Sequence, residues 1–237
     1  MKHIHTFLCL CILFGSSWNA FAFDEGDLKN LKATKQCRKC DLAEAKLTDA
    51  DLTNADLFLA NLTVADLRGA NLSGANLSGA NLYKANLTGA NLTDANLIGA
   101  KLHRANLSGA NLSGADLTAA NLRTVNLARA ILTDAILLRV KFSAADLFWA
   151  NLRKANLYGA NLTGANLTDT LLFQSNLSAA NLTGADLTGA DLTWAELIGA
   201  NLTKANLTGA ILTDANLIRA IFCDTTMQDG TMDNSGC

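Results

Sequence analysis

The chain has 237 residues, of which 50% are hydrophobic and 6% aromatic, and its 19 basic and 21 acidic residues leave a net charge of −2. A chain this apolar does not have the composition of a disordered protein, and the lack of a basic excess argues against nucleic acid as a partner. Two of the three histidines stand at positions 3 and 5. The sequence therefore predicts no enzymatic activity, no cofactor and no histidine-based metal site.

The first 22 residues have the three-part layout of a secretory signal peptide. Lys2 lies in a short polar start, residues 7–15 form an apolar run, and residues 20–22 read Ala-Phe-Ala, a small-residue cleavage site. The run is too short for a membrane span, which takes about 20 residues; an uncleaved N-terminal anchor is the alternative. We expect cleavage after Ala22, no transmembrane segment afterwards, and export to the periplasm, with the thylakoid lumen or the extracellular space as alternatives.

From residue 40 to residue 223 the sequence repeats every five residues, without an insertion, as Ala-Asn/Asp-Leu-x-x. Typical copies are ANLSG at 75–79 and ADLTG at 185–189, and phenylalanine replaces the central leucine only at Phe142 and Phe222. Five residues leave successive leucines about 140° apart around an α-helix, so they would form no stripe. On a flat strand they would alternate between the two faces. Each unit is therefore expected to combine a short extended piece with a corner.

The corner is expected to span the leucine, the two variable residues and the next alanine. A type II turn needs a positive φ at its third residue, which favours glycine or asparagine, and the second variable residue is often Gly, Asp or Asn. Other corners carry Lys84, Trp149 or Trp194 at this place, so other turn types are expected there as well. The absence of proline fits a coil whose backbone N–H groups all pair with neighbouring coils.

These repeats resemble the pentapeptide-repeat family over residues 37–223. The resemblance implies an all-β fold, a right-handed quadrilateral β-helix with 20 residues in each coil and about nine coils, in which each coil contacts only its neighbours. An uncovered coil exposes unpaired backbone groups. Residues 23–36, which break the repeat, are therefore expected to form an N-terminal cap. Residues 224–237, with the turn signal Asp229-Gly230, are expected to form a C-terminal cap tail.

Four cysteines follow residue 22, and an even number in an exported chain suggests disulfides. Cys37 and Cys40 stand on inward positions across one corner, where Cα atoms come close enough for a bridge. A buried disulfide, two buried free thiols and a redox or metal pair all remain open for them, although no nearby residues complete a zinc site. A bridge between Cys223 and Cys237 would hold the tail to the last coil.

Sorting the outward residues by a period of 20 places chemically similar side chains on common sides of the rod. The basic face, a candidate binding patch, consists of Lys84, Lys101, His103, Arg104, Arg123 and Lys141. The apolar ladder consists of Phe58, Ile98, Leu138, Tyr158, Ile198 and Ile218. The ladder either stabilises the rod by stacking between coils or forms a partner or self-association surface. Trp149 is either a binding anchor or the partner of Arg129, 20 residues earlier, in a cation–π stack.

The sequence favours a non-catalytic, exported scaffold for structure or protein interaction, whose partner is an unidentified protein or an anionic molecule. It leaves a monomer, an end-to-end dimer and a side-by-side dimer open. The alternative that the resemblance offers is a DNA mimic that interacts with gyrase, of the quinolone-resistance kind. Such mimicry needs a strongly acidic surface and access to the cytoplasm, so the mixed charge and the signal peptide argue against it.

Overall fold

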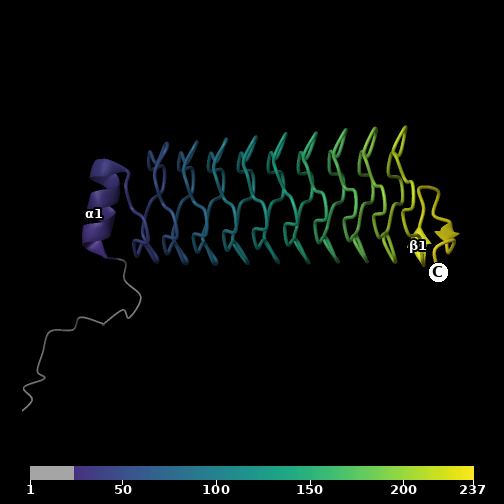
Figure 1. Cartoon of the computed structure of the whole chain (residues 1–237), viewed down its shortest axis with the longest axis horizontal. Helices are drawn as coiled ribbons and strands as arrows, with labels where there is room; N and C mark the ends of the chain where they lie inside the picture. Colours follow the sequence, from purple (N-terminus) through teal and green to yellow (C-terminus); the bar gives the residue numbers. More distant parts are fainter. Residues whose placement is uncertain (1–23) are drawn as a thin grey trace, which may run out of the picture.

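The structure, a computed structural model, describes residues 24–237, so the expected signal peptide at 1–22 lies outside the described residues. Figure 1 shows a straight rod of stacked coils with helix α1 at one end and a two-stranded sheet at the other. Helix α1 spans Glu25–Thr34, strand β1 spans Thr225–Thr226 and strand β2 spans Met232–Asp233. Among the described residues, no helix has the length and apolar character needed to cross a membrane.

Single parallel bridges join each coil to the next. They recur at every fifth residue from Gln36 to Asn206, and each partner lies 20 positions further along the chain. At one such rung, the Leu107 N–H donates to the carbonyl of Asn126 at 2.7 Å, and the Asn126 N–H donates to the carbonyl of Ala105 at 3.1 Å. Because strands paired in this way lie about 4.8 Å apart, residues 20 positions apart are close neighbours along the rod.

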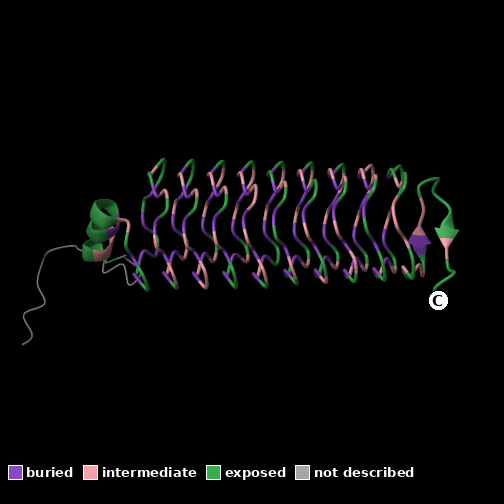
Figure 2. Cartoon of the chain, turned by 45° about the horizontal axis from the view of Figure 1, so that its top comes forward, coloured by how far each residue is buried: buried purple, intermediate pink, exposed green. Residues whose placement is uncertain are grey.

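The core is a column of leucines and alanines that runs through the rod (Figure 2). From Leu42 to Leu207 the central residue of every unit is at most 1% exposed, and Phe142 takes a leucine place without becoming exposed. The residues between these inward positions face solvent and are half-buried or exposed along nearly the whole rod. Burial of the central residues is the main stabilising term, at about 1.5–3 kcal/mol for each large side chain before conformational entropy is counted.

The Asn or Asp that precedes the central residue in most units shapes the coil through local hydrogen bonds. At Asn161 the side-chain oxygen accepts from the Thr163 N–H at 3.1 Å and from the Thr163 hydroxyl at 2.7 Å. The same pair of bonds recurs between Asn91 and Thr93, at 3.1 and 2.6 Å. An amide that bonds the backbone two residues ahead imitates a turn. The frequent Asn-Leu-Thr and Asn-Leu-Ser sequences therefore have a structural cause.

Every corner has the same left-handed backbone. The second variable residue has a positive φ in each unit from residue 39 to residue 224, including Lys84 at 55°, Trp149 at 57° and Trp194 at 59°. The expectation of other turn types at these corners is therefore wrong. A left-handed backbone costs a residue with a Cβ about 1–2 kcal/mol. The ladder imposes it nevertheless, because each corner N–H must reach the next coil, as the Trp149 N–H reaches the carbonyl of Thr168 at 3.1 Å.

Helix α1 lies over the first coil, in the segment expected to cap the rod. Asp24 caps the N-terminus of the helix, and its carboxylate accepts from the Asp27 N–H at 3.0 Å. The Asp24 N–H donates to the carbonyl of Asp41 at 3.0 Å, and the Asp41 N–H donates to the Asp27 carboxylate at 2.8 Å. Leu31 is completely buried. The all-β description therefore applies to the coils, whereas the segment before them is helical.

The C-terminal end is less completely covered. Strand β1 pairs antiparallel with β2, Thr225 opposite Asp233, while Thr226 continues the parallel ladder from Asn206. Gly230 turns the hairpin with a φ of 82°. The central residues of the last coil that lie beside this hairpin are only half-buried: Leu212, Leu217 and Phe222.

Candidate functional site

The basic face comes from successive coils on one side of the rod. The bridges run from Asn81 to Lys101, from Lys101 to Asn121 and from Asn121 to Lys141. Lys101 and Lys141 are therefore two coils apart, and an asparagine separates them. All the Lys and Arg side chains of the basic face are exposed, whereas His103 is half-buried.

Two adjacent corners form the centre of the basic face. The Lys84 N–H donates to the carbonyl of His103 at 3.3 Å, and the Arg104 N–H donates to the carbonyl of Arg123 at 3.1 Å. These bonds place Lys84 and Arg104 on neighbouring coils, and they do the same for His103 and Arg123. The structure thus brings the centre of the basic face together as the 20-residue period predicts.

Tyr83 belongs to the same surface and is absent from the predicted set. Its ring centre lies 4.3 Å from that of His103, and the Lys84 Nζ lies 5.2 Å from the Tyr83 ring centre. Arg104 donates to the Tyr83 hydroxyl at 3.5 Å. Partial desolvation raises the pKa of the Tyr83 hydroxyl, but the Arg104 hydrogen bond and the nearby positive charges outweigh it, so the pKa lies below 10.0. The sequence feature that could have identified Tyr83 is its position directly before Lys84.

A hollow of about 350 Å³ opens in the basic face, lined by His103, Arg104, Asn121, Arg123 and Thr124. The Nδ1 atom of His103 is buried and has no hydrogen-bond partner among the described residues. A buried polar atom without a partner is costly, and an imidazole nitrogen can accept or donate a hydrogen bond. Guanidinium groups bind carboxylate and phosphate oxygens in bidentate fashion. The lining of the hollow therefore suits an anionic oxygen group.

The positive charges of the basic face are not neutralised by ion pairs within residues 24–237. The ion pairs found there lie toward the N-terminal end of the rod and join Lys35 to Asp51, Arg38 to Asp56 and Arg68 to Asp66. Between residues 61 and 204, the outward positions on the side of the basic face include no Asp or Glu. Clustered like charges repel one another, although salt screens them. Folding alone therefore gives no reason for this cluster.

The apolar ladder is interrupted rather than continuous. Ile98, Tyr158, Ile198 and Ile218 are exposed, whereas Phe58 and Leu138 are half-buried. The guanidinium carbon of Arg38 lies 4.5 Å from the centre of the Phe58 ring. Serine or threonine occupies the intervening places at 78, 118 and 178. The residues of the ladder therefore do not merge into one apolar patch.

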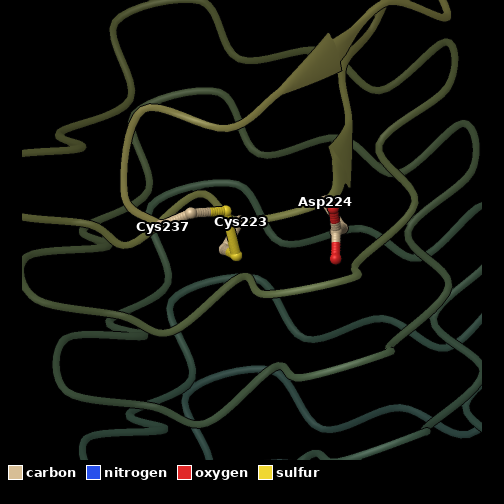
Figure 3. Close-up of side chains that lie close together, drawn as sticks. All are labelled: Cys223, Asp224 and Cys237. Carbon is tan, nitrogen blue, oxygen red and sulfur yellow. A yellow bond between two sulfur atoms is a disulfide. The ribbon is translucent and has the colours of Figure 1, made fainter.

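Both cysteine pairs form disulfides, with Cα atoms 5.2 Å apart for Cys37 and Cys40 and 4.8 Å apart for Cys223 and Cys237. The first bridge is buried and the second lies at the C-terminal end (Figure 3). Asp224 lies beside the second bridge, and the three side chains offer ligand atoms within 4.8 Å of one another. Metal binding by cysteine requires thiolates, so this cluster does not offer a cysteine metal site while the bridge is intact.

The Trp149 side chain is held by Asp169 and not by Arg129, whose stack on the indole was one of two alternatives from the sequence. Its indole N–H donates to the carboxylate of Asp169 at 3.0 Å. The cation–π contacts within residues 24–237 instead involve Arg38 with Phe58 and Lys84 with Tyr83. The cation–π alternative for Trp149 is therefore wrong, since the indole is hydrogen-bonded to Asp169, one coil later.

Comparison with known proteins agrees with the geometry of the coils. The family model "Pentapeptide repeats (8 copies)" matches residues 36–74, 70–109, 110–147, 141–178, 150–189, 175–214 and 190–229. The search of curated proteins found no match.

Several solved structures resemble the chain. HetL, a pentapeptide repeat protein involved in heterocyst differentiation regulation in the cyanobacterium Nostoc sp. strain PCC 7120, is 35% identical with a TM-score of 0.50, and the match covers 87% of this chain and 97% of HetL. A pentapeptide repeat protein from the Arabidopsis thaliana thylakoid lumen is 32% identical with a TM-score of 0.24, over 46% of this chain and 66% of that protein.

The plasmid-mediated fluoroquinolone resistance protein QnrB1 is 17% identical with a TM-score of 0.48, over 76% of this chain and 87% of QnrB1. The family model covers most of the chain, and the 20-residue ladder is what a coiled solenoid of such units requires. The chain therefore belongs to the pentapeptide-repeat family and folds as a right-handed β-helix solenoid.

Proposed function

We propose that this protein is a non-catalytic, exported scaffold whose basic face binds an anionic partner. The observation that carries the proposal is the group of Lys and Arg side chains around the hollow beside His103, none of which forms an ion pair within residues 24–237. A rigid rod holds these groups at fixed spacing, which lowers the ordering cost of binding. The same rod is proposed to be quadrilateral in cross-section, with about nine coils of four units each.

Export is proposed from the signal-peptide pattern of residues 1–22 and from the two disulfides. Disulfides persist in oxidising compartments and are rare in a reducing cytosol, and both cysteine pairs lie within bridging distance. The periplasm is the proposed compartment, ahead of the thylakoid lumen and the extracellular space. The DNA-mimic alternative is disfavoured, because a cationic surface such as the basic face does not imitate the phosphates of DNA.

The test is binding of purified residues 23–237 to dextran sulfate at low ionic strength. The triple variant Lys84→Ser, Arg104→Ser and Arg123→Ser should bind roughly tenfold more weakly or worse, because it removes the charges that surround the hollow. Binding by the unmodified chain should weaken as salt is added, since exposed charges are screened over about 10 Å at 0.1 M salt.

A matched control removes the same net charge from other sides of the rod. Arg129, Arg139 and Arg219 are exposed corner residues with left-handed φ, and their replacement by serine should leave binding close to that of the unmodified chain. Equal weakening in both triple variants would mean that net charge, rather than the basic face, attracts the polyanion. Undiminished binding by the basic-face variant would remove the proposed site.

A further inference from the structure

The geometry points to a second, independent binding surface on another side of the rod, for a neutral β-1,4-linked glycan chain. Its central feature is the aromatic diagonal, defined as Trp149, Phe173 and Trp194, whose members lie on three successive coils. Phe173 is half-buried, whereas Trp149 is 58% exposed and Trp194 55% exposed. This inference does not rest on anion binding by the basic face.

The two tryptophans occupy corners that do not favour them. Both have left-handed φ, of 57° and 59°, a conformation that disfavours residues with a Cβ. Glycine occupies the corner two coils from Trp149 in each direction, at Gly109 and Gly189, and the corner four coils before Trp194, at Gly114. An exposed indole in a left-handed corner gains little from burial, so the stability of the rod does not account for these residues. A ligand that covers the rings would account for them.

The indole of Trp149 is held in one orientation. Its N–H donates to the Asp169 carboxylate at 3.0 Å, and its ring centre lies 6.1 Å from that of Phe148, with the ring planes 29° apart. A side chain held in this way loses less conformational entropy when it binds. Because the polar edge of the indole is already bonded, its exposed apolar surface is the part available to a ligand. The carbon-bound hydrogens on one side of a pyranose ring pack well against such a surface.

Two hollows adjoin along this side of the rod and combine apolar and polar walls. One, of about 310 Å³, is lined by Trp149, Asp169 and Leu171. The other, of about 380 Å³, has Phe173, Arg153 and Asp191 among its lining residues. Leu171 and Phe173 belong to the same repeat unit, which places the hollows next to each other. Carboxylates accept and guanidinium groups donate hydrogen bonds, and sugar hydroxyls do both.

Charge and size favour a glycan over a polyanion or a folded protein. Arg153 and Lys154 are balanced here by Asp169 and Asp191, so the surface lacks the single sign of charge that marks the basic face. Along the rod axis the diagonal extends over about two coil spacings, or roughly 10 Å, and it crosses one side of the rod from the corner of Trp149 to that of Trp194. A stable protein interface buries about 800 Å² on each partner, whereas the two hollows here are lined by few residues on neighbouring coils. An extended, flat glycan fits a straight side with aromatic rings and paired donors and acceptors.

The positions of the tryptophans allow binding to be followed by fluorescence. Trp149 and Trp194 are the only tryptophans after residue 22, so the fluorescence of residues 23–237 reports on this surface alone. Titration with cellohexaose and with chitohexaose should change the tryptophan emission of the unmodified chain with at least one of them. Calorimetric titration should give the affinity. Absence of binding for both hexasaccharides would overturn the inference, as would an emission response to a protein ligand but to neither glycan.

The variants are chosen so that loss of binding cannot be ascribed to unfolding. Trp149→Gly and Trp194→Gly restore the residue found at related corners and relieve left-handed backbone, so the melting temperature should stay equal or rise. Each should weaken glycan binding roughly tenfold or more. Tyr158→Ser, which removes an exposed aromatic ring from the apolar ladder, is the control and should bind normally. Unchanged affinity in the combined Trp149→Gly and Trp194→Gly variant would overturn the inference.

Discussion

Leu107→Ala tests the register of the core at the middle of the rod. Leu107 is completely buried, and so are Leu87 and Leu127, one coil away on either side. The substitution loses about 2.4 kcal/mol of transfer free energy, at about 0.8 kcal/mol for each methylene-sized group. It also leaves a cavity. Leucine-to-alanine changes cost about 2–5 kcal/mol in total, depending on how far the surroundings collapse.

We expect a value in the upper half of that range. The Leu87 N–H donates to the carbonyl of Asn106 at 2.7 Å, and the Leu107 N–H donates to the carbonyl of Asn126 at 2.7 Å. These ladders hold the backbone on both sides of the lost side chain, so the coils cannot close around the cavity. Because each coil stabilises only its neighbours, the lesion should also weaken the coupling between the two halves of the rod.

The assay is equilibrium unfolding in urea, followed by circular dichroism and by tryptophan fluorescence. Circular dichroism reports on the whole rod, whereas Trp149 and Trp194 both lie on the C-terminal side of Leu107. In the variant the two probes should separate, because the transition is no longer two-state. Ser108→Ala is the control; Ser108 faces outward, and its backbone N–H keeps the bond to the Asn106 side chain at 3.0 Å. The reasoning is refuted if Leu107→Ala and Ser108→Ala have equal stability.

Three further predictions concern the left-handed corner conformation, stability at low pH and the disulfide of the C-terminal tail. Gly89→Ala should cost about 1 kcal/mol in urea unfolding, since φ is 64° and no atom lies within 4 Å of the added Cβ; no loss of stability would contradict the account of the corner. The Arg68 hydrogen bond lowers the pKa of Asp66 to about 2, below its unfolded value, so this stabilisation is present above about pH 4 and lost toward pH 2. Thermal melts of Asp66→Asn should lack that part of the acid dependence, and an unchanged profile would count against the pair. Reduction of the Cys223–Cys237 bridge should raise hydrogen exchange in β1 and β2 before the central coils, because the bridge restrains a loop closed over a separation of 14 residues; simultaneous exchange would contradict this role.

The sequence alone predicts which residues form the core and which outward residues share a side of the rod. The five-residue period admits one arrangement of inward and outward positions, and residues 20 positions apart stack once the coil length is known. For this reason Leu107 and the basic face were placed correctly without coordinates. The inward direction of the leucine side chains does not depend on the residues at the variable positions, because backbone hydrogen bonds between coils set that direction.

At the corners, the backbone preference of the individual residue predicts the wrong turn type. Lys84 and Trp149 prefer a right-handed or extended backbone as isolated residues, and the sequence therefore suggested other turns for them. In the rod the corner N–H donates to a carbonyl of the next coil, and the residue adopts a positive φ against its own preference. Hydrogen bonding between coils therefore outweighs the cost of a left-handed backbone, about 1–2 kcal/mol for each such residue.

The details of the candidate surfaces depended on side-chain orientation, which the repeat does not encode. Trp149 had two neighbours 20 residues away, Arg129 before it and Asp169 after it, and only the structure shows that the indole turns to Asp169. The hollow beside His103 is likewise lined by the long, exposed side chains of Arg104 and Arg123. The sequence by itself determined which residues share the core and which share a side of the rod, because a gapless period sets the backbone. Contacts between outward side chains were decided by the tertiary structure alone, because several rotamers are compatible with the same backbone.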